Sequence, residues 1–221
     1  METFFFTIEL IGVIAFAVSG AVTAIRKELD IIGIIVVSIV AALGGGLIRD
    51  IILGIIPPNM FVNTDYFVYE IVAIGVGIIS FVAAYLFNKL GKTLHKPSLV
   101  LNIADAIGLG VFCIFAVKLA VQNNFAEHKV LLVFVGVITG VGGGALRDIL
   151  VGEIPIILRK YVYATPAVLG TVFYVFTYSV MNEIAATIIG ILIIVAIRVL
   201  AIVFKWDFPS IKKKDKDSLM K

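Results

Sequence analysis

Long apolar runs, separated by short polar segments, occupy most of this chain of 221 residues. Each run is close to the ~20 residues that an α-helix needs to cross the ~30 Å hydrocarbon core of a bilayer. Transmembrane strands would instead appear as ~10-residue segments of alternating hydrophobicity, a pattern that this sequence lacks. The runs therefore predict seven transmembrane helices, at about 4–25, 31–56, 66–88, 98–121, 130–152, 164–181 and 184–204.

Composition agrees with this assignment. The chain is 61% hydrophobic and only 15% charged, whereas soluble domains carry about 25% charged residues. The N-terminus lacks the basic segment of a signal peptide, so we expect the first run to be retained as a span. The sequence thus predicts an all-α membrane protein with one transmembrane domain at 1–205 and a basic tail at 206–221.

Basic residues are distributed unevenly between the predicted loops. With seven spans, the first, third and fifth loops and the tail share one side, which carries Arg26, Lys27, Lys89, Lys92, Lys96, Arg159, Lys160, Lys205, Lys212, Lys213, Lys214, Lys216 and Lys221. The opposite side has Lys129 beside the acidic residues Glu2, Asp65, Glu127 and Glu183. Because cytoplasmic loops are enriched in Lys and Arg, we expect the N-terminus outside and the tail in the cytoplasm.

A glycine-rich motif with an adjacent cation and anion occurs twice, at a constant offset of 98 residues. Its members are Gly44, Gly45, Gly46, Arg49, Asp50, Gly54 and Pro57 in the first copy, and Gly142, Gly143, Gly144, Arg147, Asp148, Gly152 and Pro155 in the second. A weaker similarity relates 9–16 to 105–112, with Glu9 in the place of Asp105. The spans at about 4–88 and 98–181 thus form two three-helix repeats, with 184–204 added as a seventh helix. An odd number of crossings makes the repeats inverted, as in many transport proteins.

Both glycine triplets lie near the middle of their predicted spans. Each interior Gly costs a helix about 0.8–1 kcal/mol relative to Ala, so three together predict a kink or break near the bilayer midplane. The alternative is close packing against a neighbouring helix through small residues. Asp50 and Asp148 each fall on an i, i+4 stripe of small residues, which leaves space for water beside the carboxylate.

The arginines point away from that stripe, because adjacent helical residues do not face each other. We therefore expect Arg49 and Arg147 not to neutralise the neighbouring aspartates. Each is expected to bind carbonyls freed at a helix break, or a carboxylate on another span near its own level. Asp105 is predicted to line a path or to pair with an arginine, with simple structural satisfaction as the alternative. Lys118 and Arg198 are expected to reach the membrane interface from their helix ends.

Soluble catalytic chemistry finds no support in the sequence. The glycine triplets do not match a nucleotide-binding fingerprint, because they lie inside membrane spans. His95 and His128 are far apart in connecting segments, and Cys113 is the sole cysteine, which suits a small packing residue. We therefore predict no enzyme activity, no catalytic residue, no cofactor, no metal site and no nucleic-acid partner. The partners that remain are the lipid bilayer and a transported solute.

The doubled motif within this helix pattern resembles the trimeric intracellular cation (TRIC) channel family, whose prokaryotic members are also described as glycine-transporter-like. The resemblance covers nearly all of 1–205. It implies a homotrimer in the plasma (inner) membrane, with a pore inside each subunit lined by the kinked helices 31–56 and 130–152. Monovalent cations such as potassium or sodium would pass. The Lys-Glu-Val motif of eukaryotic members has no equivalent at Lys27-Glu28-Leu29, so the prokaryotic type is implied.

Three functions remain open at this point: a cation channel, a secondary carrier of a small solute such as glycine, and a scaffold in which the motifs only pack helices. Under the first two, Arg49 and Arg147 are predicted to support the geometry of the path. The residues predicted to line it are Gly44, Gly45, Gly46, Asp50, Asp105, Gly142, Gly143, Gly144 and Asp148.

Overall fold

The computed structural model describes residues 2–90, 97–159, 163–204 and 206. All its regular elements are helices: α1 (Glu2–Arg26), α2 (Ile31–Ile52), α3 (Asn59–Val62), α4 (Thr64–Lys89), α5 (Pro97–Ala120), a π-helical turn η1 (Val121–Phe125), α6 (Lys129–Leu150), α7 (Ile156–Arg159), α8 (Ala164–Thr177) and α9 (Glu183–Val203). The predicted all-α class is therefore confirmed for the described part of the chain. The predicted tail at 206–221 lies outside the described residues, apart from Trp206.

Six helices have the length and apolar composition of membrane spans: Glu2–Arg26, Ile31–Ile52, Tyr66–Lys89, Leu99–Phe125, Lys129–Leu150 and Glu183–Val203. The span predicted at 164–181 corresponds to α8, which is apolar but has only 14 residues. It is shorter than expected because the chain leaves the helix for a turn after Thr177. In α2 the helix also stops earlier than predicted, at Ile52.

Side-chain caps fix where two of the long helices begin. Asp30 accepts a hydrogen bond from the backbone N–H of Gly33 at the start of α2, over 2.7 Å. Asn182 does the same for the first turn of α9, accepting from Ile184 N at 3.0 Å and from Ala185 N at 3.3 Å. Such caps satisfy N–H groups that have no partner within the helix. Both helix starts thus follow directly from a polar residue placed before an apolar run.

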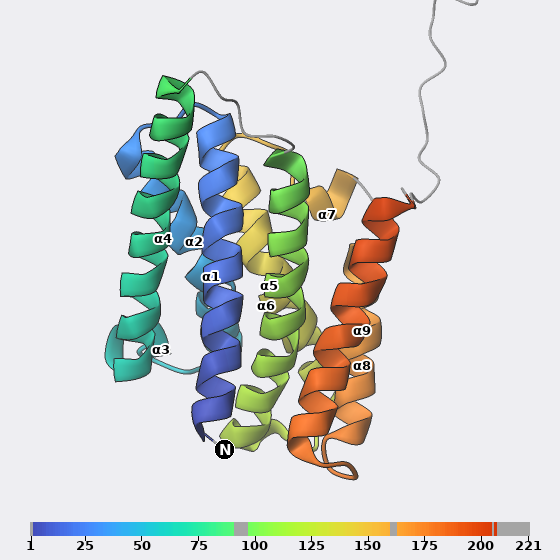
Figure 1. Ribbon diagram of the computed structural model, residues 1–221. Coiled ribbons are helices and arrows are strands. Elements are labelled where there is room, and N and C mark those ends of the chain that lie inside the picture. Colours follow the sequence, from blue (N-terminus) through green and yellow to red (C-terminus); the bar gives the residue numbers. More distant parts are fainter. Residues whose placement is uncertain (1, 91–96, 160–162, 205, 207–221) are drawn as a thin grey trace, which may run out of the picture.

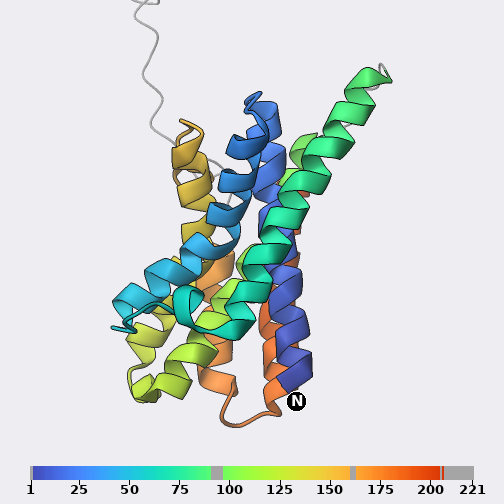
Figure 2. The ribbon, with the colours of Figure 1, turned by 90° about the vertical axis from the view of Figure 1, so that its left-hand side faces the viewer.

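The long helices lie side by side, with the N-terminus and the end of α9 at opposite ends of the bundle (Figure 1). Helix α1 packs against α2, α4 and α5, while α2 also packs against α6 and α9 packs against α5 and α8. The end of α4 that carries Lys89 diverges from the other helices (Figure 2). A cavity of about 780 Å³ lies there, lined mainly by residues of α1 and α4.

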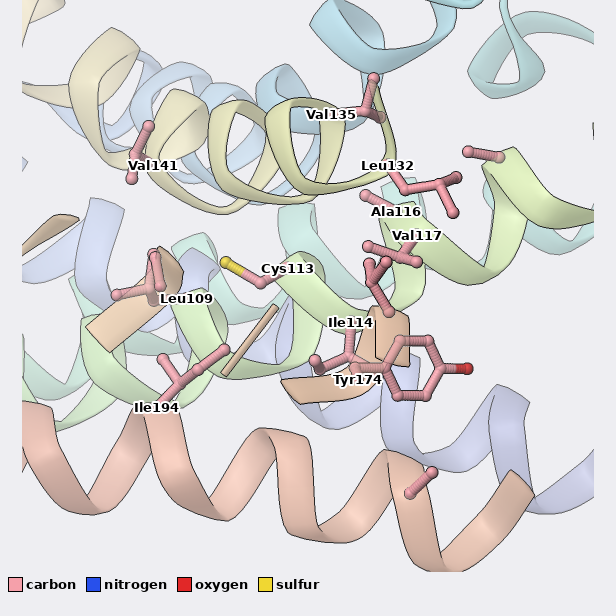
Figure 3. Packing of buried hydrophobic residues seen from close by; sticks show 14 of the residues in the cluster. Leu109, Cys113, Ile114, Ala116, Val117, Leu132, Val135, Val141, Tyr174 and Ile194 are labelled. Carbon is pink, nitrogen blue, oxygen red and sulfur yellow. The ribbon is translucent and has the colours of Figure 1, made fainter. Parts of the chain in front are cut away.

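The largest buried apolar cluster joins α5 to its neighbours in the second half of the chain. Leu109, Cys113 and Ile114 of α5 pack with residues of α6, α8 and α9 (Figure 3). Cys113 is fully buried within this cluster, which confirms its expected role as a small packing residue. Packing here fixes α5 firmly against α6, and α5 carries Asp105.

Candidate functional site

The repeated motif ends each of its helices in the same way. Gly54 and Gly152 adopt φ values of +70° and +71°, a left-handed conformation that costs glycine nothing and commonly terminates a helix. The next residue then donates its backbone N–H to the carbonyl of the motif aspartate, Ile55 to Asp50 over 2.9 Å and Glu153 to Asp148 over 2.8 Å. The two copies therefore share backbone geometry as well as sequence, and each Arg-Asp pair lies in the last turn of its helix.

The glycine triplets are the place where α2 and α6 cross. A Cβ atom on Gly45 would collide with the Thr139 carbonyl oxygen, and one on Gly143 would collide with the Ala41 carbonyl oxygen. Only glycine permits this approach of one backbone to the other. Both helices stay α-helical through the triplet, so a break is wrong, whereas a kink stays a prediction. The alternative, close packing through small residues, describes this contact.

The first pair, Arg49 and Asp50, is buried and bonded within itself. Arg49 Nε donates to Asp50 Oδ1 over 2.9 Å, and Arg49 NH2 lies 2.8 Å from the same oxygen. Arg49 NH2 also donates to the Tyr66 hydroxyl over 2.7 Å. The expectation that the arginine would not neutralise its neighbour is wrong here. Its long side chain curls back at the helix end, and its five donors can serve two acceptors at once.

The second pair, Arg147 and Asp148, repeats this contact and adds a partner on another helix. Arg147 Nε donates to Asp148 Oδ1 over 2.9 Å, so the same correction holds. Arg147 NH1 donates to Asp105 Oδ1 on α5 over 2.8 Å and also to Ser19 Oγ on α1. The expected carboxylate on another span is thus found for Arg147, and the arginine-pairing role of Asp105 is confirmed. All of these side chains are buried.

The second oxygen of each motif aspartate holds the segment that follows the helix. Asp50 Oδ2 accepts from the backbone N–H of Asn59 over 2.8 Å. Asp148 Oδ2 accepts from the backbone N–H of Ile156, also over 2.8 Å. Both carboxylates are therefore occupied on both oxygens, by an arginine and by a returning loop. Neither faces an open, water-lined space in this conformation, because both are almost completely buried.

The two charge clusters lie on opposite sides of the glycine crossing. Helices α2 and α6 run in opposite directions along the bundle (Figures 1 and 2). Arg49 follows Gly45 by four residues, and Arg147 follows Gly143 by four, a rise of about 6 Å in each helix. One cluster is therefore displaced toward the N-terminal end of the bundle and the other toward the end that carries the last turn of α9. A tight, apolar crossing separates them.

Two tyrosines complete these clusters, although neither is among the residues that the sequence predicted to line or support the path. Tyr66 accepts from Arg49, whereas the Tyr163 hydroxyl lies beside Asp105. A Cβ atom on Gly144 would lie 3.1 Å from both the Tyr163 hydroxyl and Asp105 Oδ1, so a larger residue would crowd both groups. The two tyrosines stand 97 residues apart, nearly the motif offset. That spacing is the sequence signal that could have identified them.

The remaining intramembrane polar groups separate into expected and unexpected cases. Lys118 reaches the end of its helix and pairs with Glu183 at 2.8 Å, in line with its expected position at the interface. Arg198, by contrast, is fully buried, so the expectation that it reaches the interface is wrong. Its guanidinium carbon lies 4.2 Å from the centre of the Tyr163 ring. In the described part of the chain, no group of three or more His, Cys, Asp or Glu residues could hold a metal ion.

Comparison with known proteins gives consistent matches over almost the whole chain. A family model described as glycine transporter matches residues 6–85 and 102–179. The membrane protein YvgT of Bacillus subtilis (strain 168) is 34% identical over 204 residues, which cover 92% of this chain and 94% of that protein. The inner membrane protein YadS of Escherichia coli (strain K12) is 32% identical over 206 residues, covering 92% and 94%.

Solved structures of TRIC channels share the fold. A chain from a study of conductance through TRIC cation channels is 38% identical, with a TM-score of 0.78, covering 94% of this chain and 97% of that one. The TRIC trimeric intracellular cation channel orthologue from Rhodobacter sphaeroides is 30% identical, with a TM-score of 0.82 and coverage of 92% and 100%. These neighbours are described as channels and not as enzymes.

Two findings establish the family. The family model matches more than half of the chain, and relatives that are covered over 94% of their length exceed 30% identity. The resemblance inferred from the motif is confirmed by these matches. This chain belongs to the TRIC family of membrane proteins.

Proposed function

We propose that this protein is a channel for monovalent cations, potassium foremost, with a path inside each subunit between α2 and α6. Its TRIC neighbours are cation channels, and this chain has the motif residues in their expected helices. The path would run past Asp50, Asp105 and Asp148 and through the glycine crossing. Arg49 and Arg147 would hold the carboxylates in place. In this reading the conformation described here is closed.

One observation carries the proposal: two buried Arg-Asp clusters flank a crossing that is narrow enough to exclude any side chain. Buried charges in a membrane protein are costly and usually mark a route for ions or a functional pair. Carboxylates are oxygen ligands suited to a cation that has lost part of its hydration shell. Separation of α2 from α6 at the glycines would join the two clusters into one polar passage.

We extend the proposal to topology and assembly. Helices α1, α2, α4, α5, α6, α8 and α9 would form the seven crossings, as two inverted repeats plus α9, in one domain at 1–205. Lys27 pairs with Glu153 over 2.9 Å, which joins the first and fifth loops at one end, as this topology requires. The N-terminus would lie outside and the basic tail at 206–221 in the cytoplasm, in a homotrimer of the plasma membrane.

The direct test is a recording of purified protein in a planar bilayer under a potassium chloride gradient. We expect a current whose reversal potential lies near the potassium equilibrium potential. The double variant Asp50→Asn, Asp148→Asn serves as the comparison, because it removes both motif carboxylates and keeps their shape. A silent wild-type protein, or a reversal potential near that of chloride, would contradict the proposal.

A second candidate, a carrier of a small amino acid, is favoured by the description of the family model as glycine transporter. Buried arginines are suitable partners for a substrate carboxylate. Labelled glycine uptake into proteoliposomes separates the two. Saturable uptake without a steady current would favour the carrier, and a current without saturable uptake would favour the channel.

A further inference from the structure

Arg198 on α9 is a fully buried cation that no carboxylate neutralises in the described structure. None of its three guanidinium nitrogens has a hydrogen-bond partner. The guanidinium instead stacks on the ring of Tyr163, whose centre is 4.2 Å from the guanidinium carbon. A charged donor without an acceptor is expensive inside a protein, and more so inside a membrane. A second arrangement, in which Arg198 donates to an acceptor, would therefore stabilise the buried guanidinium.

A carboxylate that could accept from Arg198 lies near the hydroxyl of Tyr163. Asp105 Oδ1 receives Arg147, but Asp105 Oδ2 is buried and without a hydrogen-bond partner in the described structure. The Tyr163 hydroxyl lies beside Asp105, while its ring lies beneath Arg198. Tyr163 thus stands between the Arg198 guanidinium, which has no hydrogen-bond partner, and the Asp105 carboxylate, which its hydroxyl contacts.

The buried charged groups around Tyr163 are equal in number, two positive and two negative, but they are unevenly paired. Two arginines, Arg147 and Arg198, face two carboxylates, Asp105 and Asp148. In the described arrangement Arg147 binds both carboxylates, with NH1 2.8 Å from Asp105 Oδ1 and NH2 2.8 Å from Asp148 Oδ1. The latter contact lacks hydrogen-bond alignment, since NH2 has no hydrogen-bond partner. A pairing of Arg147 with Asp148 and of Arg198 with Asp105 would satisfy all four groups.

The cluster of the first repeat is paired differently. There the tyrosine hydroxyl accepts directly from the motif arginine, Tyr66 from Arg49 over 2.7 Å. Glu9, in the place of Asp105, accepts instead from the Tyr69 hydroxyl over 3.1 Å. Helix α9 lies outside both repeats, so Arg198 has no counterpart in the first one. Among the described residues, it is therefore the second cluster that lies next to a buried arginine without a hydrogen-bond partner.

We propose that Arg198 is the alternative counter-cation of Asp105, and that exchange of Asp105 from Arg147 to Arg198 releases the end of α6 and opens the path on this side. Arg198 is a positioning residue, which acts through Tyr163 and Asp105. The exchange requires the Arg198 guanidinium to move from the face of the Tyr163 ring toward the hydroxyl end of that tyrosine, where Asp105 lies. This role in opening rests on the proposed channel function, but the alternative pairing does not.

The pairing itself is tested by thermal unfolding of purified protein, with no transport assay. Arg198→Met is made in the wild-type chain and in Arg147→Met, and Arg26→Met, an exposed arginine at the end of α1, is the matched control. In the wild-type chain we expect no fall in Tm. In the Arg147→Met background Asp105 depends on Arg198, so Arg198→Met should lower Tm by a further ~4 °C or more. Equal effects of Arg198→Met in both backgrounds would overturn the proposal.

If Arg147→Met does not yield folded protein, Arg147→Lys provides the second background, because lysine keeps the positive charge but cannot form the bidentate hydrogen bonds of arginine. The same contrast is expected there, with a smaller difference in Tm. An Arg198→Met effect that is identical in the wild-type chain and in Arg147→Lys would again overturn the pairing.

The role in opening is tested by single-channel recording. Arg198→Gln should lower the open probability by about tenfold, with unchanged unit conductance and reversal potential, and Arg198→Lys should restore part of it. A purely structural role would not give this separation. An unchanged open probability, or an altered conductance, would overturn the role in opening. A wild-type protein that carries no current would instead contradict the channel proposal and leave the thermal test of the pairing intact.

Discussion

Arg147 links more groups than any other residue of the motif, whereas its counterpart Arg49 links fewer. Arg147 binds Asp148, Asp105 and Ser19, and so connects α6 to α5 and α1. Arg49 binds Asp50 and Tyr66, and so connects α2 to α4. The two arginines occupy equivalent positions in sequence, but Arg147 neutralises two carboxylates and Arg49 only one. The two copies of the motif therefore share their backbone geometry but differ in the number of carboxylates that each arginine binds.

This asymmetry predicts unequal costs for the same substitution. Arg147→Met leaves Asp148 without its cation and breaks the contact with Asp105, which Arg198 could replace only by leaving its present position. An uncompensated buried charge costs about 3–5 kcal/mol. Arg49→Met leaves only Asp50, which keeps its bond from Asn59 N. We expect Arg147→Met to lower the free energy of unfolding more than Arg49→Met, by about 1–2 kcal/mol. Chemical unfolding in detergent measures both, and equal losses would contradict the asymmetry.

Side-chain contacts could be predicted where the depth of each residue in the membrane was enough to match the partners. They could not be predicted where the contact depends on the end of a helix or on a segment distant in sequence. Asp105 and Arg147 could be matched, because both are charges at a similar depth on different spans. The Arg49–Asp50 contact could not, since helical directions separate the two side chains and only the end of α2 lets the arginine turn back. Arg198 looked close enough to the end of its helix to reach water. Its burial depends on Tyr163, which precedes α8 and is distant in sequence.

At the scale of elements, the crossing of α2 and α6 is set by two glycines that leave no room for a methyl group. The nearest atoms are backbone carbonyl oxygens, of Thr139 for Gly45 and of Ala41 for Gly143. Backbone atoms cannot rotate away as a side chain can, so any larger residue must push the helices apart. The sequence indicated a special role for the triplets but could not separate a break from a crossing, because both use small residues.

Alanine substitutions test this crossing against a matched control. Gly45→Ala and Gly143→Ala should each destabilise the protein by about 1–3 kcal/mol, the usual cost of overpacking. Gly75→Ala in α4 should be neutral or stabilising, because no atom lies within 4 Å of its added Cβ and alanine favours a helix over glycine. The measurement is the free energy of unfolding for the three variants. Comparable effects at all three sites would show that the close approach is not what the glycines provide.

The whole molecule combines a well-predicted helix pattern with one short element. The hydrophobic runs predict the bounds of the six long helices to within a few residues. They do so because a bilayer requires a helix of a given length and apolar composition, and both can be read from the sequence. They could not reveal that α8 has only 14 residues, since apolar residues continue into the turn that follows it. The internal repeat was also readable, through the constant offset of its motifs. Which helices touch across the bundle depends on packing that no local pattern encodes.

Orientation in the membrane is a property of the whole chain, and introduced cysteines can measure it. Asn88 lies near the end of α4 and Glu127 lies beyond η1, both exposed, and the charge distribution assigns them to opposite sides. Cys113, the sole native cysteine, is fully buried, so it should contribute little background. In right-side-out vesicles a membrane-impermeant maleimide should label Glu127→Cys and spare Asn88→Cys. Inverted vesicles should give the reverse pattern, and labelling of both sites from one side would contradict the proposed arrangement of crossings.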